Sequence, residues 1–97
     1  MLAARTREQT LIELIELLRG FREDYDQSLD ITPATGIFRE LGFESIDVIG
    51  LSTALEAHFD QPFPFPEFMM VMRQRKPADI TVGDLHQFLM ANMRAGA

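Results

Sequence analysis

The spacing of apolar residues constrains the fold most strongly, because it recurs at steps of three and four along several stretches of the chain. The first such stretch consists of Leu11, Leu14, Ile15, Leu18 and Phe21. This spacing places the five side chains on one face of an amphipathic helix. Thr6, followed three residues later by Gln9, is typical of a capping box at the start of that helix. We find no alternation of the kind that indicates a strand.

A second helix is predicted over residues 45–59. Its inward stripe is formed by Leu51, Leu55 and Phe59, with Ala54 beside it. Ile46 and Ile49 lie on a different sector of the same helix, so this stripe does not account for them. Pro62, Pro64 and Pro66 follow, and proline cannot continue a helix interior. The second helix must therefore end near residue 60.

Two further helices complete the pattern. The third is predicted over residues 67–75, with Pro66 at its first turn and Pro77 beyond its end. The fourth begins at Thr81, with Asp84 three residues later as a variant of the capping box. Its apolar face is formed by Val82, Leu85, Phe88, Leu89 and Met93.

The first two helices are joined by a long connection, residues 23–44. Pro33 breaks any helix there, because the residue before a proline avoids helical backbone angles. Ile37, Phe38 and Leu41 are apolar and are expected to pin the connection to the core. With 97 residues, of which 46 % are hydrophobic, the chain can bury one small core. The fold class is therefore all-α, a four-helix bundle with one long loop, and residues 1–97 form a single domain.

Charge and composition exclude several classes of function. The chain has a net charge of −6, and residues 23–60 hold nine acidic residues against one arginine. Such a segment repels phosphate backbones and disfavours nucleic-acid binding, although a solvated acidic face is the simpler explanation. Without cysteine there is no disulfide and no catalytic thiol. The longest apolar run, residues 68–72, is far shorter than a membrane span, and no secretion signal pattern is present, so we expect a cytoplasmic protein.

Metal sites and catalytic triads are also disfavoured. Four residues resemble the start of a calcium loop, namely Asp24, Asp26, Ser28 and Asp30. However, Leu29 and Thr35 stand where such a loop needs glycine and glutamate. His58 and His86 fall on different helices, without the spacing of a metal site or a triad. We therefore expect no metal and no catalytic residue.

Ser45 is a more specific candidate for a functional residue. Taken alone, a serine at a helix start is most often a capping residue. Residues 41–47, Leu-Gly-Phe-Glu-Ser-Ile-Asp, resemble the Leu-Gly-x-Asp-Ser-Leu-Asp signature of acyl carrier proteins. The same family is resembled by residues 31–33 and 80–85 and, within the second helix and its end, by Leu51, Ala54, Leu55, Glu56, Phe59 and Asp60. The similarity therefore covers most of the chain. It implies a four-helix acyl-carrier-like bundle.

The resemblance also implies a cofactor and partners. Ser45 would carry 4′-phosphopantetheine, with Glu44, Ile46 and Asp47 beside it, after modification by a phosphopantetheinyl transferase. Ile46, Asp47, Ile49 and Glu56 would contact partner enzymes, such as a ligase, a ketosynthase or an acyltransferase. The alternative for the two isoleucines is that they extend the core. The chain would act as a monomer that carries substrates and is not itself an enzyme.

Several positions depart from the family pattern. Glu44 replaces the usual aspartate, and Gly50, Ala57 and His58 stand where acids are frequent. About eight residues are inserted between Phe68 and residue 78. They are expected to extend the third helix and include Met69, Met70 and Met72 and the basic residues Arg73, Arg75 and Lys76.

These departures favour a stand-alone carrier in a specialised fatty-acid, polyketide or lipid-modifying pathway. Two alternatives remain open. One is a peptidyl or aminoacyl carrier of the same fold, although such carriers usually show Gly-Gly-x-Ser. The other is an unmodified helical interaction module in which Ser45 is only a cap.

Overall fold

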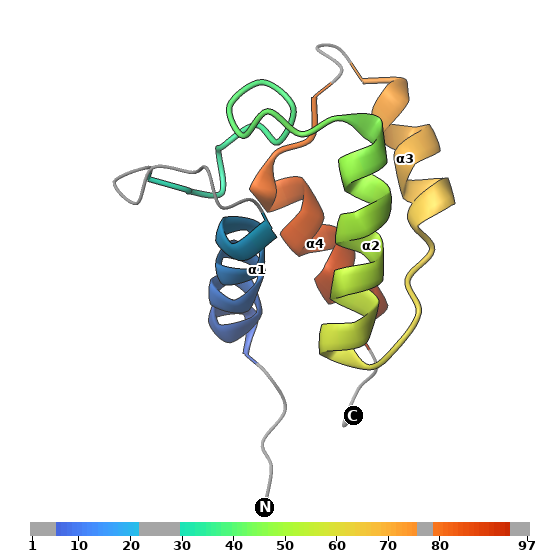
Figure 1. The fold of residues 1–97 in the computed structure, drawn as a ribbon. Helices are drawn as coiled ribbons and strands as arrows, with labels where there is room; N and C mark the ends of the chain where they lie inside the picture. The colour runs from blue at the N-terminus through green and yellow to red at the C-terminus, as the bar shows by residue number, and fades with distance from the viewer. Residues whose placement is uncertain (1–5, 22–29, 76–78, 94–97) are drawn as a thin grey trace, which may run out of the picture.

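The computed structural model describes residues 6–21, 30–75 and 79–93. Over these residues the chain forms four helices and no strand, as Figure 1 shows: α1 (Arg7–Phe21), α2 (Ser45–Phe59), α3 (Phe65–Arg73) and α4 (Val82–Asn92). An isolated bridge joins Gly36 to Thr81. The predicted all-α, four-helix fold with a long loop after the first helix is confirmed.

The predicted start of α1 is confirmed in detail. The N–H of Gln9 donates to the Thr6 hydroxyl at 3.0 Å, and the Thr6 N–H donates to the Gln9 side chain at 3.2 Å. Leu14 and Leu18 are fully buried. Phe21, the last residue of the predicted stripe, ends the helix, and its side chain lies outside the described part of the chain.

Helices α2 and α4 bury the faces that their sequences predict. On α2 the buried residues are Val48, Leu51, Leu55 and Phe59, so the stripe has one member that the sequence did not indicate. On α4, Val82, Leu85 and Leu89 are buried and Phe88 is partly buried, as is Met93 directly after the helix. Thr81 caps α4, with both hydrogen bonds of the predicted capping box present.

The predicted third helix is shifted by two residues. We expected residues 67–75, whereas α3 is Phe65–Arg73 and has nine residues. It begins earlier because proline is tolerated in a first turn, where the missing N–H has no partner within the helix. It ends earlier because the N–H groups of Gln74 and Arg75 bond to carbonyls three residues back, which tightens the chain. The insertion thus does not extend α3 beyond Arg73.

The connection before α2 is docked on the start of α4. Ile37 and Leu41 are buried and Phe38 is partly buried, which confirms the three predicted anchors. The N–H of Ile37 donates to the Ile80 carbonyl at 2.7 Å, and that of Val82 donates to the Thr35 carbonyl at 2.9 Å. In Figure 1 this loop lies at the same end of the bundle as the start of α2, the end of α3 and the start of α4.

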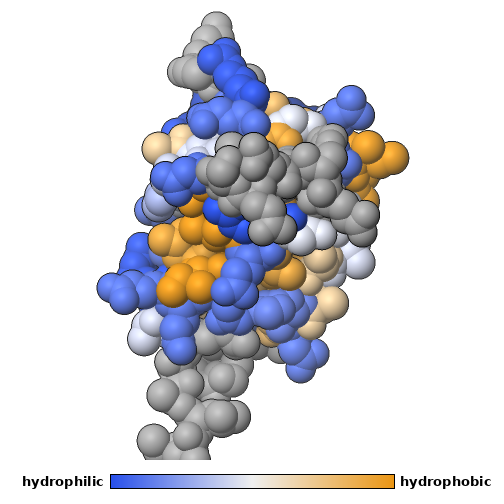
Figure 2. All heavy atoms as spheres, turned by 60° about the vertical axis from the view of Figure 1, so that its left-hand side comes forward, coloured by the Kyte–Doolittle hydropathy of each residue, from blue (hydrophilic) through white to orange (hydrophobic). Residues whose placement is uncertain are grey.

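The remaining surface is mixed in character. Figure 2 views the side on which α1 lies, where hydrophilic side chains border an apolar area. Ile12 of α1 is 55 % exposed. None of the helices in the described segments is long and apolar enough to cross a membrane.

Candidate functional site

A tight turn at Gly42 leads into the start of α2. Gly42 has φ 71°, a left-handed conformation that glycine adopts without a steric penalty. Leu41 and Phe43, on either side of it, are buried. The Phe43 N–H also donates to the Ile37 carbonyl at 3.1 Å. These anchors fix the backbone immediately before Ser45.

Glu44, rather than Ser45, caps α2. The Glu44 backbone is extended, and its N–H donates to the Asp47 carboxylate at 2.7 Å. Ser45 is the first helical residue, and it is exposed. Within the described segments no residue forms a hydrogen bond with its hydroxyl. The interpretation of Ser45 as a mere cap is therefore wrong, and its hydroxyl is free to be modified.

The start of α2 also suits a phosphodiester electrostatically. The first amides of a helix have no partners within it, and its dipole places partial positive charge there. An anion at such a position is stabilised by about 0.3–1 kcal/mol when it is exposed. The Asp47 carboxylate already accepts a hydrogen bond from one backbone N–H at this helix start, that of Glu44. The exposed Ser45 hydroxyl at this position fits the attachment of a phosphate-linked group.

The two isoleucines beside Ser45 do not belong to the core. Ile46 is 71 % exposed and Ile49 is 67 % exposed. The alternative in which they extend the core is therefore wrong. Gly50 and Ala57 share their face, at helical steps of three, four and seven residues. We call this face, residues 46, 49, 50, 53 and 57, the outer face of α2.

An apolar groove runs between α2 and α3 with a volume of about 480 Å³. Its lining consists of Val48, Ile49, Ser52, Phe65, Pro66, Met69, Met70 and Arg73. Met70 and Val71 are 63 % and 58 % exposed, whereas Phe68 is buried. Residues 68–72 therefore do not all face the core. The sequence did not reveal that this run of methionines meets α2 to form a groove.

Glu56, the fourth predicted partner contact, has a structural contact at the other end of α2. Its carboxylate accepts a hydrogen bond from the Phe63 N–H at 2.8 Å. It lies eleven residues from Ser45, about 16 Å along the helix axis. Asp60 follows in a left-handed conformation with φ 55° and ends the helix. The structure therefore separates Glu56 from the other three predicted contacts.

The histidines take no part in the site. His58 contacts Glu13 of α1 at 2.6 Å, and His86 contacts the Arg7 carbonyl at 2.8 Å. Within the described segments no group of three or more ligating side chains could hold a metal ion. Three of the four residues that resemble a calcium loop, Asp24, Asp26 and Ser28, lie outside those segments.

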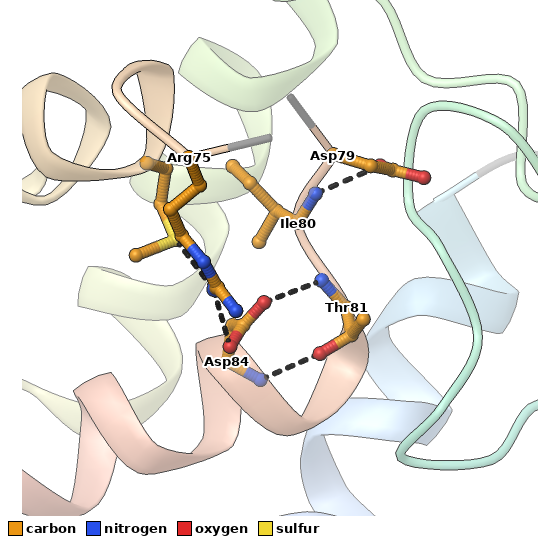
Figure 3. Close-up of polar contacts among 6 residues, drawn as sticks. Arg75, Asp79, Ile80, Thr81 and Asp84 are labelled. Carbon is orange, nitrogen blue, oxygen red and sulfur yellow. Dashed lines mark hydrogen bonds and ion pairs between the residues drawn. The ribbon is translucent and has the colours of Figure 1, made fainter. Parts of the chain in front are cut away.

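The basic residues at and beyond the end of α3 include one that forms an ion pair within the chain. Arg75 forms an ion pair with Asp84 at 2.7 Å (Figure 3). Burial raises the pKa of Asp84, but the hydrogen bond from Arg75, those from Thr81 and the charge of Arg75 outweigh it and lower that pKa below its ordinary value. Arg73 remains exposed, and Lys76 lies outside the described residues.

Comparison with protein families identifies the class of this site. A family model described as a phosphopantetheine attachment site matches residues 16–80, which include α2 and the loop before it. The chain belongs to this family. Its members carry covalently attached 4′-phosphopantetheine, which is therefore the cofactor of this chain, and they are generally carriers rather than catalysts. Neither a curated protein nor a solved structure matches the chain significantly.

Proposed function

We propose that this chain is an acyl carrier protein in which Ser45 bears the 4′-phosphopantetheine. The observation that supports this most directly is the exposed Ser45 hydroxyl, without a hydrogen-bond partner among the described residues, at the first position of α2. When attached, the group supplies a terminal thiol that holds acyl intermediates as thioesters. This thiol takes the place of the cysteine that the chain lacks.

The residues of the chain present the arm and do not catalyse its attachment. The Ser45 oxygen forms the new bond to phosphorus when a phosphopantetheinyl transferase cleaves the pyrophosphate bond of coenzyme A, and adenosine 3′,5′-bisphosphate leaves. The Ser45 proton passes to the transferase, since no base in the described segments forms a hydrogen bond with the hydroxyl. Glu44, Ile46 and Asp47 surround the attachment point, and the α2 amides stabilise the phosphodiester.

The outer face of α2 suits the docking of partner enzymes. Ile46 and Ile49 provide exposed apolar contacts, and Asp47, which lies beside this face, adds a negative charge. Interfaces commonly combine a small apolar centre with a polar rim. We propose that enzymes which load and process acyl groups bind here, in a specialised fatty-acid, polyketide or lipid-modifying pathway of the cytoplasm. Glu56 contributes at most at the edge, since its carboxylate also holds residue 63.

One experiment separates a carrier from an unmodified interaction module. The full chain is incubated with coenzyme A and a broad-specificity phosphopantetheinyl transferase, and intact mass is recorded. We expect one added group on the wild type and none on Ser45→Ala. Ser52→Ala is the matched control, because Ser52 lies in the same helix but donates to the Ile49 carbonyl. A wild type that stays unmodified, or a modified Ser45→Ala, would contradict the proposal.

A further inference from the structure

Asp79 joins two parts of the chain that are far apart in sequence. Its Oδ1 atom accepts hydrogen bonds from the Phe38 N–H at 3.0 Å and from the Ile80 N–H at 2.8 Å. Figure 3 shows Asp79 and Ile80 on the segment that leads to Thr81 and α4. A single carboxylate oxygen therefore ties the loop before α2 to the segment before α4.

The contacts continue from this loop toward Ser45. Ile37, which precedes Phe38, donates its N–H to the Ile80 carbonyl and accepts a hydrogen bond from the Phe43 N–H at 3.1 Å. The Leu41 N–H donates to the Gly36 carbonyl at 3.1 Å. Because Phe43 lies two residues before Ser45, the start of α2 takes its orientation from the loop that Asp79 holds.

Gly36 leaves the room that this arrangement requires. A methyl group at this position would collide with the Asp79 carboxylate. The Gly36 N–H is occupied by the Glu40 side chain at 3.1 Å, which closes the same loop from within. Gly36 and Asp79 therefore form a pair whose fit can be disrupted from either side.

We propose that Asp79 is a positioning residue for the modification of Ser45, acting through residues 36–43. This inference rests on the proposed function, because it concerns how readily the transferase modifies that hydroxyl. Asp79 does not touch the hydroxyl. It fixes the backbone that carries it, and misplacing a reacting atom by about 1 Å can cost about a hundredfold in rate.

The test compares transferase kinetics of three variants of the full chain. We expect Asp79→Ala to lower kcat/KM for the carrier about tenfold, mainly through kcat. Asp79→Asn should restore a rate within about twofold of the wild type, because its amide oxygen can accept both hydrogen bonds. Leu17→Ala, in the partly buried part of α1, is the control for general destabilisation. All rates are measured at a temperature where circular dichroism shows each variant to be folded.

Amide hydrogen exchange provides an independent reading of the same contacts. In Asp79→Ala the amides of Phe38 and Phe43 should exchange faster, while those of α1 should not. Gly36→Ala should also slow the modification of Ser45 and speed the exchange of these amides. Combined with Asp79→Ala, it should change these rates little further, because both substitutions disrupt the same contact. If Asp79→Ala does not fold, Gly36→Ala provides the test in its place.

Two outcomes would overturn the inference. Either Asp79→Ala slows modification no more than Leu17→Ala, or its Phe43 amide stays as protected as in the wild type. If the wild type itself gains no group, the proposed function fails, and the exchange rates still decide whether Asp79 orders the segment before Ser45.

Discussion

The two ends of α2 are built in opposite ways. At its start, Ser45 and Ile46 point to solvent, and the order comes from backbone hydrogen bonds of the preceding loop. At its end, Phe59 is buried, and the side chains of Glu56 and His58 contact the following turn and α1. The first end leaves its side chains available to other molecules, whereas the second uses them to hold the fold.

The residues available for modification and docking therefore lie at the start of α2, and those that stabilise the fold lie at its end and on its buried stripe. A carrier must expose its attachment point and the side chains around it, so these contribute little to the core. The contacts near residues 56–63 and the buried stripe of α2 must then hold the helix in place. Substitutions at the start should change modification and docking, and those at the end should change stability.

The largest expected change is a loss of folding stability when the buried stripe of α2 is altered. Leu55 is fully buried, so Leu55→Ala should lower the free energy of unfolding by about 2–5 kcal/mol. Ile49→Ala, on the exposed side of the same helix, should change it by about 0.5 kcal/mol or less. Urea denaturation of both variants provides the measurement. Equal losses would show that the two faces of α2 are not distinct.

A smaller effect is expected at the end of α2. Glu56→Ala leaves the Phe63 N–H without its acceptor and should cost about 1 kcal/mol. Glu56→Gln retains an oxygen acceptor and should keep most of the stability. Neither variant should slow the modification of Ser45 in the transferase assay. A slower transfer with unchanged stability would instead make Glu56 a transferase contact.

The ion pair between Arg75 and Asp84 predicts that the stability of the fold depends on pH in the acid range. The pKa of Asp84 is lowered in the folded state, so its stabilising effect is complete above the unfolded pKa and is lost as pH falls through the folded one. The excess stability of the wild type over Asp84→Asn should therefore shrink below about pH 4. Because Arg75 is half exposed, this excess should stay below about 1 kcal/mol. Thermal unfolding at several pH values tests this, and an excess that grows in acid would contradict the ion pair.

The features that the sequence predicted correctly are mostly local. The caps at Thr6 and Thr81 follow from donors and acceptors three residues apart, and the buried stripe of α2 follows from helical spacing. The proposed role of Ser45 came from a family resemblance, because local chemistry alone indicates a cap. The contacts of Asp79 with Phe38 and of Arg75 with Asp84 could not be predicted, since they join parts of the chain that only the fold brings together.

The smallest expected effect concerns the choice of partner. The resemblance implies that carriers of general fatty-acid synthesis meet basic enzyme surfaces through acids along this helix. Here Gly50 and Ala57 leave the outer face of α2 without those charges. His58, the third departure, contacts Glu13 of α1, so a glutamate at position 58 would place two carboxylates together. Positions 50 and 57 are therefore the places to add charge.

We expect the modified protein to be a poor substrate for general fatty-synthase enzymes, and Gly50→Glu combined with Ala57→Glu to improve it severalfold. Each surface charge is worth only about 0–1 kcal/mol, but encounter rates depend on the summed electrostatic field of all the charges.

Gly50→Gln with Ala57→Gln is the matched control. It adds side chains of similar size and removes the helix glycine, but adds no charge. Malonyl-loading and condensation rates are measured beside a housekeeping carrier at low and high salt. The gain should shrink as salt is raised, because exposed charges are screened beyond about 10 Å at 0.1 M. If the glutamine pair gains as much as the glutamate pair, the preference arises from helix stability and not from charge.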